Sequence, residues 1–209
     1  MKRKVDEIRD LDIMMFSCNG THDFLTDNQI TPDFFVMLDA RPCNDFAKIP
    51  QKDCVYFLAS QCHPNVFDRF KSYNVMLWHT EHEWLPKKAI ERQGRDHFGY
   101  VSAKGSVGLT SIGLAYTLGF REFHLYGFDS SFEESQHSYK QEQNENDEIV
   151  THEINGKLFR STPALMGQIW NFINTEKLLK ELGCTIVMKS EGLVKEIYEQ
   201  LQRDRKANH

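Results

Sequence analysis

Residues 104–132 read KGSVGLTSIGLAYTLGFREFHLYGFDSSF, and this stretch decides the fold class. It opens with small residues, continues with a broad apolar stripe at helical spacing, and reaches Gly119, which is typical of a helix C-cap. Residues 122–126 then read as a buried strand, followed by the polar residues of the segment Asp129–Ser131. Because ligands of α/β proteins gather where parallel strands end, the same stretch predicts part of a functional site.

Working outward, continuous apolar runs recur along the chain. Such runs are typical of strands that are covered on both faces, as in a parallel sheet. They are residues 12–17 (DIMMFS), 34–38 (FFVML), 54–58 (CVYFL), 74–78 (NVMLW) and 185–188 (TIVM). Between two of them, residues 65–73 show a helical apolar face. Alternating strands and helices favour right-handed βαβ units.

The C-terminal half carries other signals. Residues 133–148 are strongly polar and predict a lid loop. Asn155-Gly156 separates VTHEI from KLFRS, which predicts a β-hairpin. Pro163 starts a helix predicted to run to Leu182, and a last helix follows Gly192. We therefore predict an α/β fold with three Rossmann-like layers, a mostly parallel sheet, a small hairpin and a polar lid, in a single domain over residues 1–209.

Composition narrows the function classes. The net charge of −5 argues against a basic nucleic-acid surface, and no apolar run reaches the ~20 residues of a membrane span. The charged start MKRKVDEIRDLD lacks an apolar signal core, so we expect a cytoplasmic protein. Five cysteines without a C-x-x-C pair disfavour disulfides and structural zinc, and no haem or flavin is expected. Cys54 and Cys184 are predicted core residues.

Polar and small residues stand at four predicted strand or helix ends that would converge on one edge of the sheet. They are Asn19, Gly20, Asp39, Arg41, Gly105, Ser106, Val107, Gly108, Asp129, Ser130 and Ser131. Backbone N–H groups of Gly105–Val107 could hold a phosphate, although Ser106 could equally be an N-cap. The K-G-S-V-G run matches neither the P-loop nor the dinucleotide fingerprint. Asp39 and Asp129 could hold Mg²⁺ beside a polyphosphate, or Asp129 could cap a following turn.

Two histidine-containing segments are further candidates. His137 and Tyr139 in the predicted lid could close over a ligand and supply acid–base contacts, whereas a plain loop histidine is simply solvated. His79 and His82 form an H-x-x-H pair, but a zinc site needs a third ligand. A solvated charge run that starts a helix is the favoured interpretation of that pair.

These motifs together resemble a known family. The blocks that carry the resemblance are Cys18-Asn19-Gly20, ITPDFFVMLDARP at residues 30–42, the run at residues 105–132 and the loop with His137-Ser138-Tyr139. They resemble the 6-hydroxymethylpterin diphosphokinase MptE-like family, which includes motility-associated-factor proteins linked to flagellin glycosylation. A more distant similarity is to bacterial sialyltransferases with a Rossmann-like fold.

The resemblance implies a Rossmann-like fold and a nucleotide-linked donor. Donors in such proteins are ATP with Mg²⁺ for pyrophosphoryl transfer, or a nucleotide sugar for glycosyl transfer. It places Asn19, Asp39, Ser106 and Asp129 on the donor side and His137 and Tyr139 on the lid. Two departures stand out: the chain lacks the family's first strand with its G-x-G-P-S-L-type loop, and it lacks the histidine that follows the lid in sialyltransferases.

Three functional hypotheses follow. The first is a transferase-like domain that binds a nucleotide-activated donor. The second is a non-catalytic binding module of the same fold, and the third is a metal-dependent hydrolase that uses His79, His82 and a carboxylate. A missing first strand would expose a sheet edge, and exposed edges tend to be covered, so a homodimer is also predicted.

Overall fold

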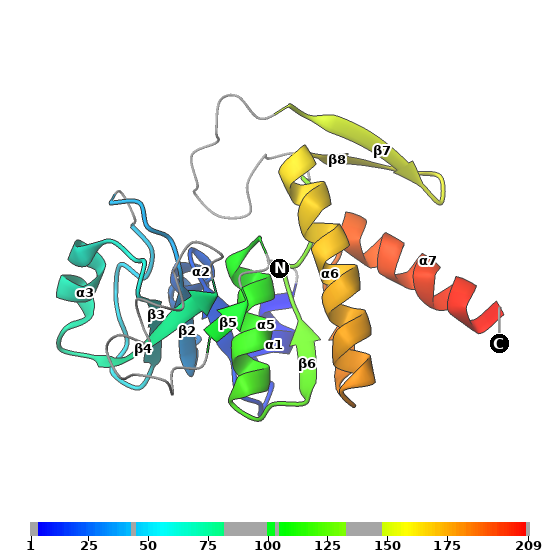
Figure 1. The fold of residues 1–209 in the computed structure, drawn as a ribbon. Coiled ribbons are helices and arrows are strands. Elements are labelled where there is room, and N and C mark those ends of the chain that lie inside the picture. The colour runs from blue at the N-terminus through cyan, green and yellow to red at the C-terminus, as the bar shows by residue number, and fades with distance from the viewer. Residues whose placement is uncertain (1–3, 43–44, 82–99, 103–104, 133–147, 208–209) are drawn as a thin grey trace. The chain divides into compact units, whose positions relative to one another are not determined.

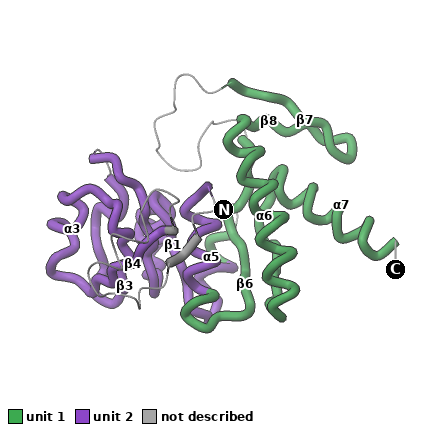
Figure 2. Tube along the Cα trace, in the orientation of Figure 1, with its two compact units in different colours: residues 1–6, 116–209 green, residues 7–115 purple. Residues whose placement is uncertain are grey.

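The computed structural model describes residues 4–42, 45–81, 100–102, 105–132 and 148–207 of the 209-residue chain (Figure 1). The chain forms two compact units (Figure 2). Unit 2 is residues 7–115, and unit 1 joins residues 1–6 to residues 116–209. The predicted single domain over the whole chain stays a prediction.

Unit 2 is built on a parallel sheet whose strands follow chain order, β1-β2-β3-β4-β5. The strands are β1 (Phe16–Cys18), β2 (Phe34–Met37), β3 (Val55–Ala59), β4 (Asn74–Glu81) and β5 (Tyr100–Ser102). Each described strand pairs in parallel with the next, for example Cys18 with Val36 and Val36 with Phe57. Since all strands point the same way, their carboxyl ends lie along one edge.

Helices connect and flank these strands. They are α1 (Val5–Arg9), α2 (Thr21–Asp27), α3 (Pro64–Phe70) and α5 (Val107–Thr117), of which α1 and α5 each extend across a boundary between the units. The mostly parallel sheet with flanking helices confirms the predicted Rossmann-like α/β fold.

The core of unit 2 explains why the strands form. Phe35, Val36, Met37 of β2 and Tyr56, Phe57, Leu58 of β3 are all at most 3% exposed. Successive residues of a strand point to opposite faces, so the sheet is covered on both faces at β2 and β3. The apolar runs of these two strands therefore have the predicted cause, and Cys54 is buried as predicted. The runs at residues 12–17 and 74–78 differ, because Ile13, Met14 and the segment 75–77 are exposed.

Unit 1 combines a parallel strand pair with a hairpin and two helices. Strand β6 (Glu122–Leu125) pairs with β9 (Thr185–Met188), and β7 (Val150–Ile154) pairs with β8 (Lys157–Ser161) in an antiparallel hairpin. Helices α6 (Pro163–Glu181) and α7 (Leu193–Ala207) complete it. The hairpin turn at Asn155-Gly156 and the helix start at Pro163 are confirmed, and Cys184 is buried as predicted.

Three local predictions differ from the structure. The strand predicted over residues 12–17 is shorter and begins later, because β1 spans only Phe16–Cys18. The run at His79 was expected to begin a helix, but its described part, His79–Glu81, ends strand β4 and pairs with β5. Backbone pairing with a neighbouring strand therefore outweighs the helical charge pattern there. Helix α2 was not predicted, because its sequence THDFLTD lacks a clear apolar stripe, although His22, Phe24 and Leu25 are buried.

A buried carboxylate joins the two long helices of unit 1. The Glu176 side chain is 2% exposed and lies 2.5 Å from Lys180 Nζ and 2.9 Å from Arg205 Nη1 of α7. Gln202 Nε2 donates a third bond at 3.1 Å. Burial alone would raise the pKa of Glu176, but the bonds and charges of Lys180 and Arg205 outweigh it and lower that pKa. The cluster therefore holds α6 to α7 through an ionised carboxylate.

We predict that Glu176→Gln lowers the free energy of unfolding at pH 7 by about 1–3 kcal/mol, because charge-assisted bonds are lost in a buried place. The folded-state pKa of Glu176 is lowered, so its stabilisation is fully present above the ordinary glutamate pKa of about 4.3. It is lost as the pH falls through the lowered folded value.

Urea unfolding of both proteins at pH 7 and at pH 3 measures this difference, which should shrink in acid. Glu199→Gln is the matched control, since Glu199 pairs with Lys195 at 3.5 Å on the exposed side of α7. Its effect should stay within about 0.5 kcal/mol. Equal effects of the two substitutions at pH 7 would contradict the assigned role of Glu176.

Candidate functional site

The first predicted position lies where β1 meets α2. Asn19 follows the last residue of β1 and adopts a left-handed backbone with φ of 47°. Gly20 precedes the first turn of α2 and accepts the Phe24 N–H at 3.1 Å. The Asn19 Oδ1 atom is buried and has no hydrogen-bond partner among the residues that the structure describes. A buried acceptor without a partner is costly, so this atom marks a place where a donor from a ligand or water would bind favourably.

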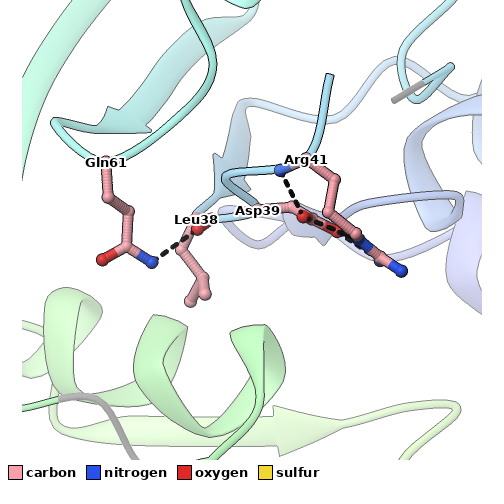
Figure 3. Close-up of polar contacts among 4 residues, drawn as sticks. All are labelled: Leu38, Asp39, Arg41 and Gln61. Carbon is pink, nitrogen blue, oxygen red and sulfur yellow. Dashed lines mark hydrogen bonds and ion pairs between the residues drawn. The ribbon is translucent and has the colours of Figure 1, made fainter. Parts of the chain in front are cut away.

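The second position follows β2. Asp39 accepts bonds from Arg41, at 3.0 Å from Nε to each carboxylate oxygen and 2.5 Å from Nη2 to Oδ2 (Figure 3). The Arg41 backbone N–H also donates to Oδ1 at 3.0 Å. Bonding to Arg41 is the main reason that the pKa of Asp39 is lowered, and it outweighs the opposing effect of burial. Asp39 is therefore an ionised carboxylate held by its neighbour two residues on.

A chain of side-chain bonds braces the ends of β2, β3 and β4. Gln61 Nε2 donates to the Leu38 carbonyl at 2.7 Å (Figure 3), and the Thr80 hydroxyl donates to Gln61 Oε1 at 2.8 Å. Thr80 is only 2% exposed. At the same strand ends, His79 Nδ1 lies 2.9 Å from Ser60 Oγ. These bonds fix the loops that follow three neighbouring strands.

The third position is the start of α5. Gly105 has φ of 81°, and Ser106 Oγ accepts the Leu109 N–H at 3.3 Å, so Ser106 is an N-cap. Cys18 Sγ, at the end of β1, donates to Ser111 Oγ in α5 at 3.5 Å. The first turns of α5 are thereby held beside the end of β1, close to Asn19. Burial raises the pKa of the Cys18 thiol to about 11, despite a lowering effect of that bond, so this thiol stays protonated.

Asp129 belongs to unit 1, where it links two loops by hydrogen bonds. Its Oδ1 atom accepts the Glu191 N–H at 3.0 Å, and its carbonyl accepts the Val194 N–H at 3.2 Å. Ser131 Oγ accepts the Leu193 N–H at 3.1 Å. The loop after β6 is thus bonded to the loop after β9, at the start of α7.

The predicted residues therefore fall into three groups. Unit 2 brings Asn19, Gly20, Asp39 and the Gly105–Val107 turn to the carboxyl edge of its sheet, and Asp129 lies at the end of β6 in unit 1. His137, Tyr139 and His82 lie outside the described residues. Sequence reasoning placed Arg41 beside Asp39 at a strand end but passed over Gln61 and Thr80 as site residues, although each stands at or just beyond a strand end, which was the available signal.

The described ranges contain no group of three or more His, Cys, Asp or Glu side chains placed to hold a metal ion. None of the helices in these ranges combines the length and apolar character required to cross a bilayer.

These features define a Rossmann-like α/β protein with polar residues along the carboxyl edge of its parallel sheet. Sequence comparison assigns it to a family. The family model described as "6-hydroxymethylpterin diphosphokinase MptE-like" matches residues 2–135, which is more than half of the chain. The chain belongs to this family, as the resemblance of its motifs predicted. Membership supports a transferase-like function. No curated protein matches the chain significantly.

A solved structure shares the fold. It is the MAf glycosyltransferase from Magnetospirillum magneticum AMB-1, with a TM-score of 0.56 and 15% sequence identity. The similarity covers 98% of this chain and 34% of that one, so this chain spans about a third of the length of that protein. At this identity the comparison supports the fold.

The loop around Asp129 yields a prediction about Gly192. This glycine has φ of 91°, and an added Cβ would lie 2.6 Å from Ser131 Oγ and 2.9 Å from the Asp129 carbonyl oxygen. We expect Gly192→Ala to destabilise the protein by about 1–3 kcal/mol, through backbone strain and displacement of both groups. Chemical denaturation measures the change.

Gly167→Ala is the control, because Gly167 lies inside α6 and its added Cβ would meet nothing within 4 Å. Alanine is the better helix former, so this substitution should leave stability unchanged or raise it by up to about 1 kcal/mol. If Gly192→Ala proved as harmless as Gly167→Ala, the proposed close packing of the two loops would be wrong.

Proposed function

We propose that this chain is a transferase-like domain that binds a nucleotide-activated donor at the carboxyl edge of the sheet in unit 2. The observation that carries the proposal is the buried Oδ1 of Asn19, which no described residue contacts by a hydrogen bond, next to a helix start that the Cys18–Ser111 bond holds in place. Family membership supports the transferase class. The transferred group is a pyrophosphoryl or a glycosyl group.

Each element has a distinct role in this proposal. Backbone N–H groups at the start of α5 stabilise phosphate charge, because the helix N-terminus carries a partial positive charge. Asn19 Oδ1 accepts an N–H or O–H from the nucleoside part of the donor. Phosphoryl chemistry depends mainly on positioning and charge stabilisation, so no covalent nucleophile is needed.

The other parts of the proposal rest on the sequence. Mg²⁺ at Asp39 and Asp129, catalytic roles for Asp129, His137 and Tyr139, a homodimer and a cytoplasmic location remain predictions. A non-catalytic binding module of the same fold would bind the donor without turnover, and product formation from any nucleotide donor distinguishes it. The hydrolase hypothesis at His79 gains no support from its observed bond to Ser60.

Asn19→Gly tests the proposed donor site. Glycine accepts the left-handed backbone at this position while removing the side chain, so the fold should be kept. We expect the wild type to be stabilised by at least one nucleotide or nucleotide sugar in a thermal-shift panel, with and without Mg²⁺. Asn19→Gly should weaken that ligand at least tenfold, or by about 1.4 kcal/mol.

Gln29→Gly is the control for this experiment. Gln29 also has a left-handed backbone, with φ of 61°, but it lies between α2 and β2, at the opposite edge of the same sheet. The Gln29→Gly variant should bind the ligand with the affinity of the wild type. Absence of any ligand effect on the wild type, or unchanged affinity in Asn19→Gly, would refute the proposed site.

A further inference from the structure

The pair formed by Asp39 and Arg41 is asymmetric in exposure. The Asp39 side chain is 16% exposed and that of Arg41 is 64% exposed. The carboxylate thus lies inside the loop and the guanidinium outside it. Because Asp39 accepts from Nε, Nη2 and the Arg41 backbone N–H, it fixes the direction of the arginine. An arginine held this way loses little side-chain entropy when it binds a ligand.

The loop that carries the pair is anchored from neighbouring strands. Gln61 holds the Leu38 carbonyl, and the buried hydroxyl of Thr80 holds Gln61 in turn. Cys62 Sγ also donates to the Met37 carbonyl at 3.5 Å. The residue immediately before Asp39 therefore has its position set by β3 and β4. This support makes the exposed guanidinium a built feature of the sheet edge.

The position of Arg41 suits an anionic ligand of the proposed donor site. Strands β1 and β2 are neighbours, and Cys18 pairs with Val36, so Asn19 and Asp39 both follow the same end of adjacent strands. Adjacent strands lie about 4.8 Å apart, so the loops that carry Asn19 and Arg41 leave the sheet side by side, and we infer that Arg41 can reach a nucleotide bound at Asn19. The charge of Asp39 is already matched by Arg41. A cation at Asp39 would therefore approach an arginine that repels it.

We propose that Arg41, oriented by Asp39, binds a phosphate group of the donor directly and without a metal ion. The proposal rests on the proposed function, since it identifies the phosphate anchor of that same site. Guanidinium groups bind phosphate oxygens through two parallel N–H bonds, which explains why an arginine and its orienting carboxylate stand together here. In this arrangement Asp39 is a positioning residue.

Titration calorimetry with inorganic pyrophosphate, ADP, GDP, UDP and CDP tests the assignment, each in EDTA and in Mg²⁺. We expect at least one of these anions to bind the wild type in EDTA, and Arg41→Gln to weaken it ten- to hundredfold. Arg41→Lys should recover part of the loss, because it restores the charge but not the paired donors. Asp39→Asn should weaken the anion less than Arg41→Gln does.

Arg69→Gln is the control for charge. Arg69 also lies in unit 2, but it stands in the last turn of α3 and donates to the Phe46 carbonyl at 2.7 Å. The affinity of the Arg69→Gln variant for the anions should stay within about twofold of that of the wild type. Thermal unfolding of each variant without ligand checks that the fold is kept.

The outcomes separate the two proposals. If Arg41→Gln binds as tightly as the wild type while Asn19→Gly does not, the donor site stands and the role of Arg41 is wrong. If the wild type binds only with Mg²⁺ and Asp39→Asn abolishes binding, the metal prediction at Asp39 replaces this one. If no anion in the panel and no nucleotide sugar binds the wild type under either condition, both proposals fail.

Discussion

The structure depends on the burial of β2 and β3 on both faces. Each strand contributes three consecutive core residues that are almost fully buried from solvent: Phe35, Val36 and Met37 in β2, and Tyr56, Phe57 and Leu58 in β3. Strands β2 and β3 leave few polar positions at the centre of the sheet. Most of the polar side chains considered for the site therefore stand at or beyond the strand ends. Because the strands are parallel, these ends lie along one edge, where Asn19, Asp39 and Gln61 are found.

At that edge, hydrogen bonding within the protein separates structural from binding groups. Asp39, Gln61 and Thr80 have partners, so they brace the loops. Asn19 Oδ1 is buried without a partner in the described part of the chain. His22 Nδ1 is also unpartnered, but His22 packs among aromatic rings, and burial lowers its pKa to about 4, so it stays neutral in the core. Asn19 differs because it stands at a strand end, where a ligand can supply the missing donor.

The sequence predicted elements with strong local signals. The run of β9 matched to the residue, that of β2 to within one, and Asn155-Gly156 formed the expected hairpin. Helix α2 was missed because its burial comes from tertiary packing. Asn19 and Asp39 were predicted at the carboxyl edge of the sheet because each follows a predicted strand. The Gln61–Thr80 bond spans 19 residues and the direction of Arg41 depends on its turn, so neither contact has a local sequence signal.

The two carboxylates proposed as Mg²⁺ ligands are both occupied in the structure, by different means. Arg41 holds Asp39, and the Glu191 N–H at the start of α7 holds Asp129. A divalent ion would have to share or displace these donors, at the cost of the bonds that fix each loop. An anionic donor bound by N–H groups needs no such displacement. The guanidinium of Arg41 and the helix start at Ser106 supply those groups within one unit, which favours phosphate binding by the protein itself.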